Sequence, residues 1–88
     1  MTIQDVNRVF KKLQMETRES GDTIAKFRYN GKVVLRSKVS HGKGELQGSL
    51  PHLVCQQLRV SRPEFDLISG CKYSRPEYEQ ILRDKGVI

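Results

Sequence analysis

The dipeptide Asn30-Gly31 is the feature that most constrains the fold of this chain. It lies between two segments of alternating apolar and polar residues, 23–29 and 32–41. Asn-Gly favours the positive φ angles of a tight hairpin turn, and alternation is typical of strands that bury one face. The sequence therefore predicts an antiparallel β-hairpin near the middle of the chain.

The length of the turn decides which side chains share a face. A two-residue turn would pair Phe27 with Val34 and mix apolar and basic side chains on both faces. A three-residue turn of Tyr29, Asn30 and Gly31, with a G1 bulge at the glycine, separates them, and we expect this turn. One face then carries Ala25, Phe27, Val33, Leu35 and Val39, and the other carries Lys26, Arg28, Lys32, Arg36, Lys38 and Ser40, with Ile24 and Val34.

Helical segments are predicted on both sides of the hairpin. Apolar residues recur with a helical period in residues 2–18, where Thr2 and Asp5 form a short capping box. Three short helices are expected after a glycine-rich loop. The last two begin with a repeated motif in which Ser is the N-cap, Pro lies in the first turn and Glu closes a capping box. The three helices are predicted at about 50–59, 62–69 and 75–85.

Together these elements predict one α+β domain spanning residues 1–88. It consists of an N-terminal helix, an antiparallel hairpin or small three-stranded sheet, and three short C-terminal helices packed on one sheet face. Residues 43–48 are the candidate third strand. A chain of 88 residues buries a small core, so a deep enclosed substrate cavity is not expected.

The net charge of +6 is concentrated in one part of the chain. Six basic residues and no acidic residue lie between Thr23 and Gly44, whereas the rest of the chain has ten of each sign. Alternate positions of a strand lie about 7 Å apart, which suits contacts to successive phosphates. The window predicts a nucleic-acid site formed by Lys26, Arg28, Lys32, Arg36, Lys38 and Lys43. The alternative is a solvated face whose lysines prevent aggregation of strand edges.

Ser40 and His41 lie where the second strand of the hairpin meets the glycine-rich loop. A histidine that titrates near neutral pH can take a proton from an RNA 2′-hydroxyl, and neighbouring lysines can stabilise the charge that develops on the phosphate. This arrangement would cleave RNA without a metal. The alternative is a loop histidine that hydrogen-bonds the backbone.

The sequence contains no motif for a metal or another cofactor, and we expect neither. His41, His52, Cys55 and Cys71 lack the spacing of a zinc site. Phosphate-binding loops, nucleophile elbows and dinucleotide fingerprints are absent. No apolar segment is long enough to cross a membrane, and the N-terminal residues lack the features of a secretory signal, so the cytoplasm is the expected location.

Three features carry a resemblance to a known family: the leading amphipathic helix, the basic hairpin, and the Ser-His pair within Lys38-Val39-Ser40-His41-Gly42. The C-terminal run from Gly70 to Ile88 adds to them. In these features the chain resembles the HicA-type toxins of prokaryotic toxin–antitoxin pairs. The resemblance implies a fold like that of a double-stranded-RNA-binding domain, with helices on one sheet face. It also implies mRNA cleavage by His41 with Ser40 as its neighbour, and an acidic antitoxin-type protein as partner.

From the residues and the resemblance we expect an RNA-binding protein of the HicA type. If the protein is an enzyme, we expect a metal-independent endoribonuclease that uses His41. Two alternatives remain open. One is a nucleic-acid-binding module without catalysis, and the other is a protein–protein adaptor that uses the basic hairpin face.

Overall fold

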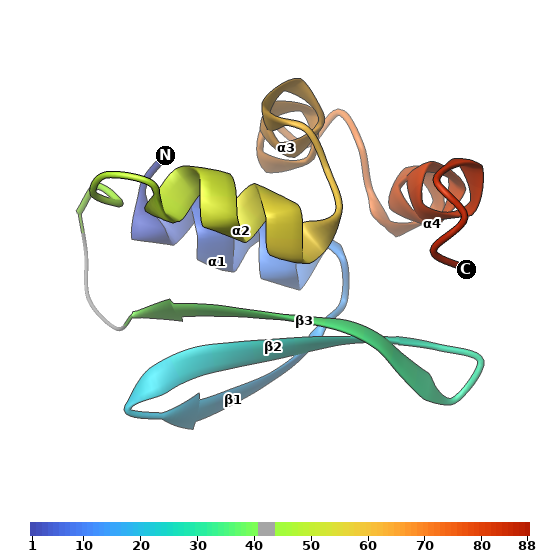
Figure 1. Ribbon diagram of the computed structural model, residues 1–88, viewed down its shortest axis with the longest axis horizontal. Coiled ribbons are helices and arrows are strands. Elements are labelled where there is room, and N and C mark those ends of the chain that lie inside the picture. The colour runs from blue at the N-terminus through green and yellow to red at the C-terminus, as the bar shows by residue number, and fades with distance from the viewer. Residues whose placement is uncertain (41–43) are drawn as a thin grey trace.

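Four helices lie on one side of a three-stranded antiparallel sheet in the computed structural model, which describes residues 1–40 and 44–88 (Figure 1). The strands are adjacent in chain order. The predicted α+β class and the three C-terminal helices on one sheet face are confirmed. The elements are α1 (Ile3–Lys12), β1 (Glu16–Ser20), β2 (Asp22–Tyr29), β3 (Lys32–Ser40), α2 (Leu50–Leu58), α3 (Arg62–Ser69) and α4 (Arg75–Asp84).

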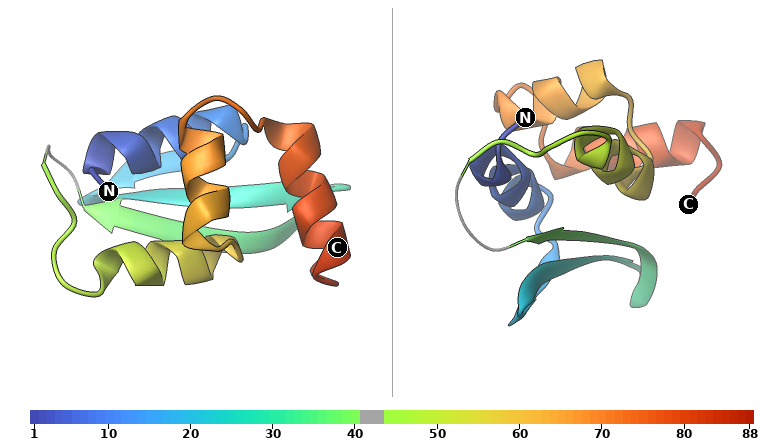
Figure 2. Two further views of the ribbon diagram at one scale, coloured as in Figure 1. Left: turned by 90° about the horizontal axis from the view of Figure 1, so that it is seen from above. Right: turned by 60° about the vertical axis from the view of Figure 1, so that its left-hand side comes forward.

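The buried apolar side chains form one cluster between the sheet and the helices. Helices α1 and α2 run along the sheet, α3 crosses above them, and α4 covers the turn end of the hairpin (Figure 2). Phe27 of β2 is fully buried and meets Tyr78 of α4 edge-to-face, with ring centroids 5.0 Å apart. This contact fixes α4 to the sheet, because aromatic pairs prefer this geometry.

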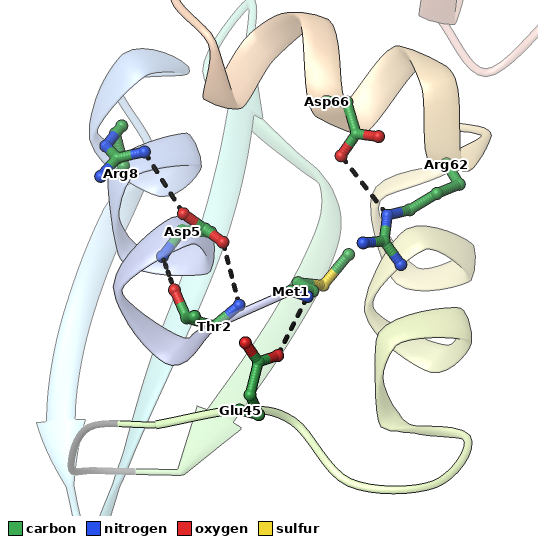
Figure 3. Close-up of polar contacts among 7 residues, drawn as sticks. All are labelled: Met1, Thr2, Asp5, Arg8, Glu45, Arg62 and Asp66. Atoms are coloured by element: carbon green, nitrogen blue, oxygen red, sulfur yellow. Dashed lines mark hydrogen bonds and ion pairs between the residues drawn. The ribbon is translucent and has the colours of Figure 1, made fainter.

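The predicted capping boxes position the helices. At α1 the Asp5 amide donates to Thr2 Oγ1 at 3.0 Å, and the Thr2 amide donates to Asp5 Oδ2 at 2.9 Å (Figure 3). The bond from the Thr2 backbone lowers the pKa of Asp5. At α3 the Ser61 amide likewise donates to Glu64 Oε1 at 2.7 Å. Each box satisfies amides that a helix start leaves without partners.

The segment predicted as one helix over residues 2–18 is divided between two elements. Helix α1 ends at Lys12, Gln14 adopts a left-handed φ of 54°, and β1 follows. All five residues of β1 are exposed, so its sequence has no apolar alternation that would reveal a strand. The third strand therefore precedes the hairpin. The expectation of a strand at 43–48 is wrong, because Glu45 in the described part of this segment forms an isolated bridge with Thr2.

The hairpin turn has two residues, and the predicted three-residue turn is wrong. Asn30 and Gly31 have φ angles of 53° and 78°, and Tyr29 pairs directly with Lys32. Positive φ at both central residues is the geometry that Asn-Gly favours most. With this turn alone, the strands would pair in the register that places apolar and basic side chains together on both faces.

A β-bulge after the turn separates the faces again. Arg28 pairs with Val33 but Phe27 pairs with Leu35, so Val34 is an extra residue in β3. Beyond the bulge the register differs by two residues from the predicted one, and a shift of two leaves every side chain on the same face. The predicted faces are thus confirmed for the strand bodies. Val33 is the exception on the apolar side, because it is 36% exposed opposite Arg28.

Candidate nucleic-acid interface

The side of the sheet that faces away from the helices forms what we call the open face. No described segment covers this side, as Figure 1 and the right-hand view of Figure 2 show. An antiparallel sheet can present one face to water, and its exposed side chains then carry the surface chemistry. Strand pairing places on the open face Glu16, Arg18, Ser20, Asp22, Ile24, Lys26, Arg28, Val33, Arg36, Lys38 and Ser40.

The cations of the open face form a grid across the three strands. Lys26 of β2 lies directly opposite Arg36 of β3. In the neighbouring row Ile24 lies between Arg18 of β1 and Lys38 of β3. Directly opposed side chains are about 5 Å apart and successive rows about 7 Å apart. The grid thus presents several positive charges within the reach of one nucleic-acid strand.

Two of the predicted cations are paired with acidic residues. Arg28 Nε lies 2.6 Å from Glu16 Oε2, and Lys38 Nζ lies 3.2 Å from Asp22 Oδ2. The hydrogen bond from Arg28 lowers the pKa of Glu16. Both carboxylates lie outside the acid-free window 23–44 in sequence, but the fold brings them onto the same face. The charge of the window is therefore partly neutralised.

Three cations of the open face form no ion pair with any described residue: Arg18, Lys26 and Arg36. Lys26 and Arg36 are also direct cross-strand neighbours. Like charges in such a pair destabilise a sheet. Glu16 lies on the other side of Lys26 and its negative charge offsets part of this repulsion. An anion bound beside Arg36 would offset the remainder.

The remaining predicted site residues are placed less closely together. Lys32 pairs with Tyr29 at the turn, and strand alternation puts it on the side of Tyr29 rather than beside Lys26, so its expected place on the basic face is wrong. Ser40 is the exposed last residue of β3, opposite Asp22. His41 and Lys43 lie outside the described residues.

The open face has no aromatic side chain among its residues. Phe27 is buried on the opposite side, and the Tyr29 hydroxyl accepts a hydrogen bond from Arg83 at 3.2 Å. Proteins that bind single strands on a sheet usually stack bases on exposed aromatic rings. The open face therefore suits contacts to phosphates better than contacts to bases.

Arg18 is not predicted as a site residue from the sequence, because the apolar period favours a helix over residues 2–18. Arg18 pairs with Ile24 and extends the grid onto the first strand. The turn-forming run Ser20-Gly21-Asp22 is the signal that could have revealed this strand, since such residues connect neighbouring strands.

Metal binding, thiol chemistry and a membrane-spanning helix find less support than anion binding in residues 1–40 and 44–88. There, no three His, Cys, Asp or Glu side chains are grouped so that they could hold a metal. Cys55 is buried, and burial raises the pKa of its thiol, which disfavours the reactive thiolate. Among the described helices, none has the length and apolar character needed to cross a bilayer.

Comparisons of the chain with protein-family models, with curated proteins and with solved structures give no match. The candidate interface therefore rests on the geometry and charge of this chain.

Proposed function

We propose that the chain binds RNA through phosphate contacts on the open face of its sheet. The observation that carries the proposal is the opposed pair Lys26 and Arg36 on an uncovered face, since neither cation forms an ion pair with a described carboxylate and only Lys26 has one, Glu16, as a cross-strand neighbour. A phosphate between two such cations would relieve their repulsion and gain charge-assisted hydrogen bonds. Arg18 would extend the contact toward β1.

The shape of the face favours an RNA duplex. Double-stranded RNA has a wide, shallow minor groove bordered by phosphates and 2′-hydroxyls, and proteins recognise it by shape. A broad sheet face fits such a surface better than the minor groove of B-DNA, which is about 6 Å wide. The resemblance to HicA-type toxins, whose implied substrate is mRNA, points to the same class of ligand.

Binding of a labelled RNA duplex of about 16 base pairs tests the proposal. We compare the wild type with the triple variant Arg18→Gln, Lys26→Gln, Arg36→Gln by fluorescence anisotropy. The triple variant should bind at least about tenfold more weakly, because each lost phosphate contact removes electrostatic free energy. A DNA duplex of the same sequence, measured in parallel, should bind more weakly than the RNA.

A control of equal charge separates the open face from overall charge. The variant Lys11→Gln, Lys12→Gln, Lys72→Gln also removes three positive charges, and these lysines lie outside the open face. This control should retain most of the affinity for RNA. Equal losses in both variants would contradict a localised site.

Metal-independent RNA cleavage is the second candidate function. It is favoured by the exposed Ser40, which ends β3 on the open face and directly precedes His41 in the sequence. The test is incubation of the purified protein with RNA in EDTA, alongside His41→Ala. Cleavage by the wild type and not by the variant is expected. RNA that stays intact, or is cut equally by both proteins, would rule out the catalytic hypothesis and leave the binding hypothesis in place.

We also propose a cytoplasmic location, and the resemblance suggests an acidic antitoxin-type partner on the basic hairpin face. The adaptor alternative differs from the RNA proposal in one measurable way. If the open face serves an acidic protein alone, the triple variant and the wild type will bind RNA equally weakly.

A further inference from the structure

The second edge strand of the sheet, β3, forms a groove with helix α2. Two adjoining hollows of about 330 Å³ and about 660 Å³ lie along it and share Leu53 and Gln57 in their linings. We call this feature the β3–α2 groove. It lies at the rim of the sheet and is separate from the cation grid, although Arg36 and Lys38 border both.

The floor of the groove is apolar and open to solvent. Leu50 and Leu53 of α2 are 43% and 45% exposed, the highest values among the large hydrophobic residues of the described chain. Val34 and Val54 line the groove beside them. Two neighbouring exposed leucines beside a hollow are typical of a surface that binds another chain.

The wall of the groove is a strand edge. Antiparallel strands direct the amides of alternate residues away from their partner, and the Lys38 amide points outward, where it donates to Gln57 Oε1 at 3.2 Å. By the same alternation Arg36 and Ser40 direct their backbone groups outward. No described residue forms a backbone–backbone hydrogen bond to this edge. The outward groups of Arg36 and Ser40 therefore offer donors and acceptors to an additional strand, which would also displace the Gln57 side chain from the Lys38 amide.

The positive charge around the groove favours an acidic partner. Its lining includes Arg36, Lys38 and Arg59 and, among the described residues, no carboxylate. Lys38 is paired with Asp22 of β2, so Arg36 and Arg59 are the cations of the lining that form no ion pair with a described residue. A second copy of β3 would bring Arg36 and Lys38 against the same cations, and like charges across strands are unfavourable. An acidic strand would instead meet opposite charges.

We infer that the β3–α2 groove binds an extended acidic segment of a partner protein as a fourth strand. Side chains of a strand alternate between the faces of the sheet. One set would rest on Leu50 and Leu53 and must be apolar. The other set would lie beside Arg36 and Lys38 and must be acidic. The partner segment is thus an alternation of acidic and apolar residues, bound by strand addition.

A synthetic peptide of about nine residues that alternates Glu and Val tests the inference. Its control is a reordered peptide of the same composition with all valines adjacent. The protein variant is Leu50→Ser, Leu53→Ser, and the matched variant is Val33→Ser, which changes an exposed apolar residue outside the groove. Because all three side chains are exposed, both variants should fold.

The alternating peptide should bind the wild type and the Val33→Ser variant equally. It should bind the double-leucine variant at least about tenfold more weakly, and the reordered peptide should be similarly weak. Equal binding of both peptides would mean attraction by charge alone and would overturn strand addition. A wild type that dimerises in sedimentation experiments, through the same leucines, would overturn the acidic partner in favour of a second copy.

Backbone methylation of the peptide gives the sharpest test. If the peptide adds antiparallel to β3, the peptide amides that face β3 are those of the glutamates, which lie beside Arg36 and Lys38. If it adds parallel, the peptide amides that face β3 are those of the valines. N-methylation of one set should abolish binding and methylation of the other should not. If neither pattern reduces binding, the inference is wrong. If RNA binding falls in the double-leucine variant while peptide binding does not, the groove belongs to the nucleic-acid site instead.

Discussion

Arg75 joins three parts of the molecule through one side chain. Its guanidinium carbon lies 4.5 Å from the centre of the Phe27 ring. Its nitrogens donate to the carbonyls of Leu13 at 3.0 Å and Arg28 at 2.6 Å, and to Glu79 at 2.9 Å. A planar group with five donors can make these contacts at once. Arg75 therefore links α4 to the end of α1 and to β2.

Arg75→Lys should destabilise the protein by about 2 kcal/mol, because an ammonium cannot replace the fork of donors or stack as well on Phe27. The measurement is the free energy of unfolding in urea. Arg62→Lys is the control, since Arg62 forms an exposed pair with Asp66 within α3. A lysine at position 75 that costs no more than the control would contradict the role given to Arg75.

Tyr78 predicts a dependence of stability on alkaline pH. Its buried hydroxyl donates to the Leu58 carbonyl at 2.7 Å, and burial raises its pKa above the ordinary value of 10.0. The folded state thus binds the proton more tightly than the unfolded state. The stability from this group is fully present below pH 10 and is lost as pH rises above it.

Tyr78→Phe should cost about 1–2 kcal/mol near neutral pH, because the buried carbonyl loses its donor. The cost should stay constant up to about pH 9 and shrink as the pH rises from about 10 to about 11, since the variant has no phenol to ionise. Urea unfolding of both proteins across this range measures the difference. A constant difference at every pH would contradict the buried hydrogen bond.

At the scale of elements, the sequence predicted those whose signals are local. Ser61 and Ser74, each followed by Pro and Glu, gave the starts of α3 and α4 correctly. β1 was not predictable from alternation because all its residues are exposed. Its stability comes from pairing with β2, which a local pattern does not contain. The faces of the hairpin were predictable, but the bulge that produces them was not.

Deletion of Val34 tests whether the bulge sets the faces. Without this residue the two-residue turn would lead directly into the observed pairing of Phe27 with Leu35. The deletion variant should therefore fold, with a loss of about 1–2 kcal/mol for the half-buried valine, and retain RNA affinity.

The comparison variant lacks Ser37, which is buried in the body of β3. Its deletion should reverse the faces of Lys38 and Val39 and prevent stable folding. Thermal unfolding and RNA binding measure both variants. If deletion of Val34 is as damaging as deletion of Ser37, the account of the bulge is wrong.

At the scale of the whole molecule, the sheet divides the protein into two layers with different roles. The helix side holds the apolar core, and the open face keeps cations that the fold does not neutralise. The open face has five cations and two carboxylates, so it carries +3 of the net charge of +6, centred on Arg18, Lys26 and Arg36. The sequence predicted Lys26 and Arg36 from their alternation, whereas Arg18 and the carboxylates opposing Arg28 and Lys38 required the fold.

The patch also predicts that binding and stability respond differently to one substitution. Lys26→Gln removes both the repulsion from Arg36 and the attraction to Glu16, its two cross-strand neighbours, so its unfolding free energy at low salt should stay close to that of the wild type. Its affinity for RNA should fall. A variant that loses stability as well would show that Lys26 has a structural role.

The most direct test of the proposed nucleic-acid interface is the salt dependence of RNA binding. The association constant is measured from about 50 mM to about 200 mM salt for the wild type and for Arg18→Gln, Lys26→Gln, Arg36→Gln. Each phosphate contact contributes nearly one to the slope of log K against log salt, so the triple variant should have a slope about 2–3 smaller in magnitude. An unchanged slope would contradict phosphate binding by the open face.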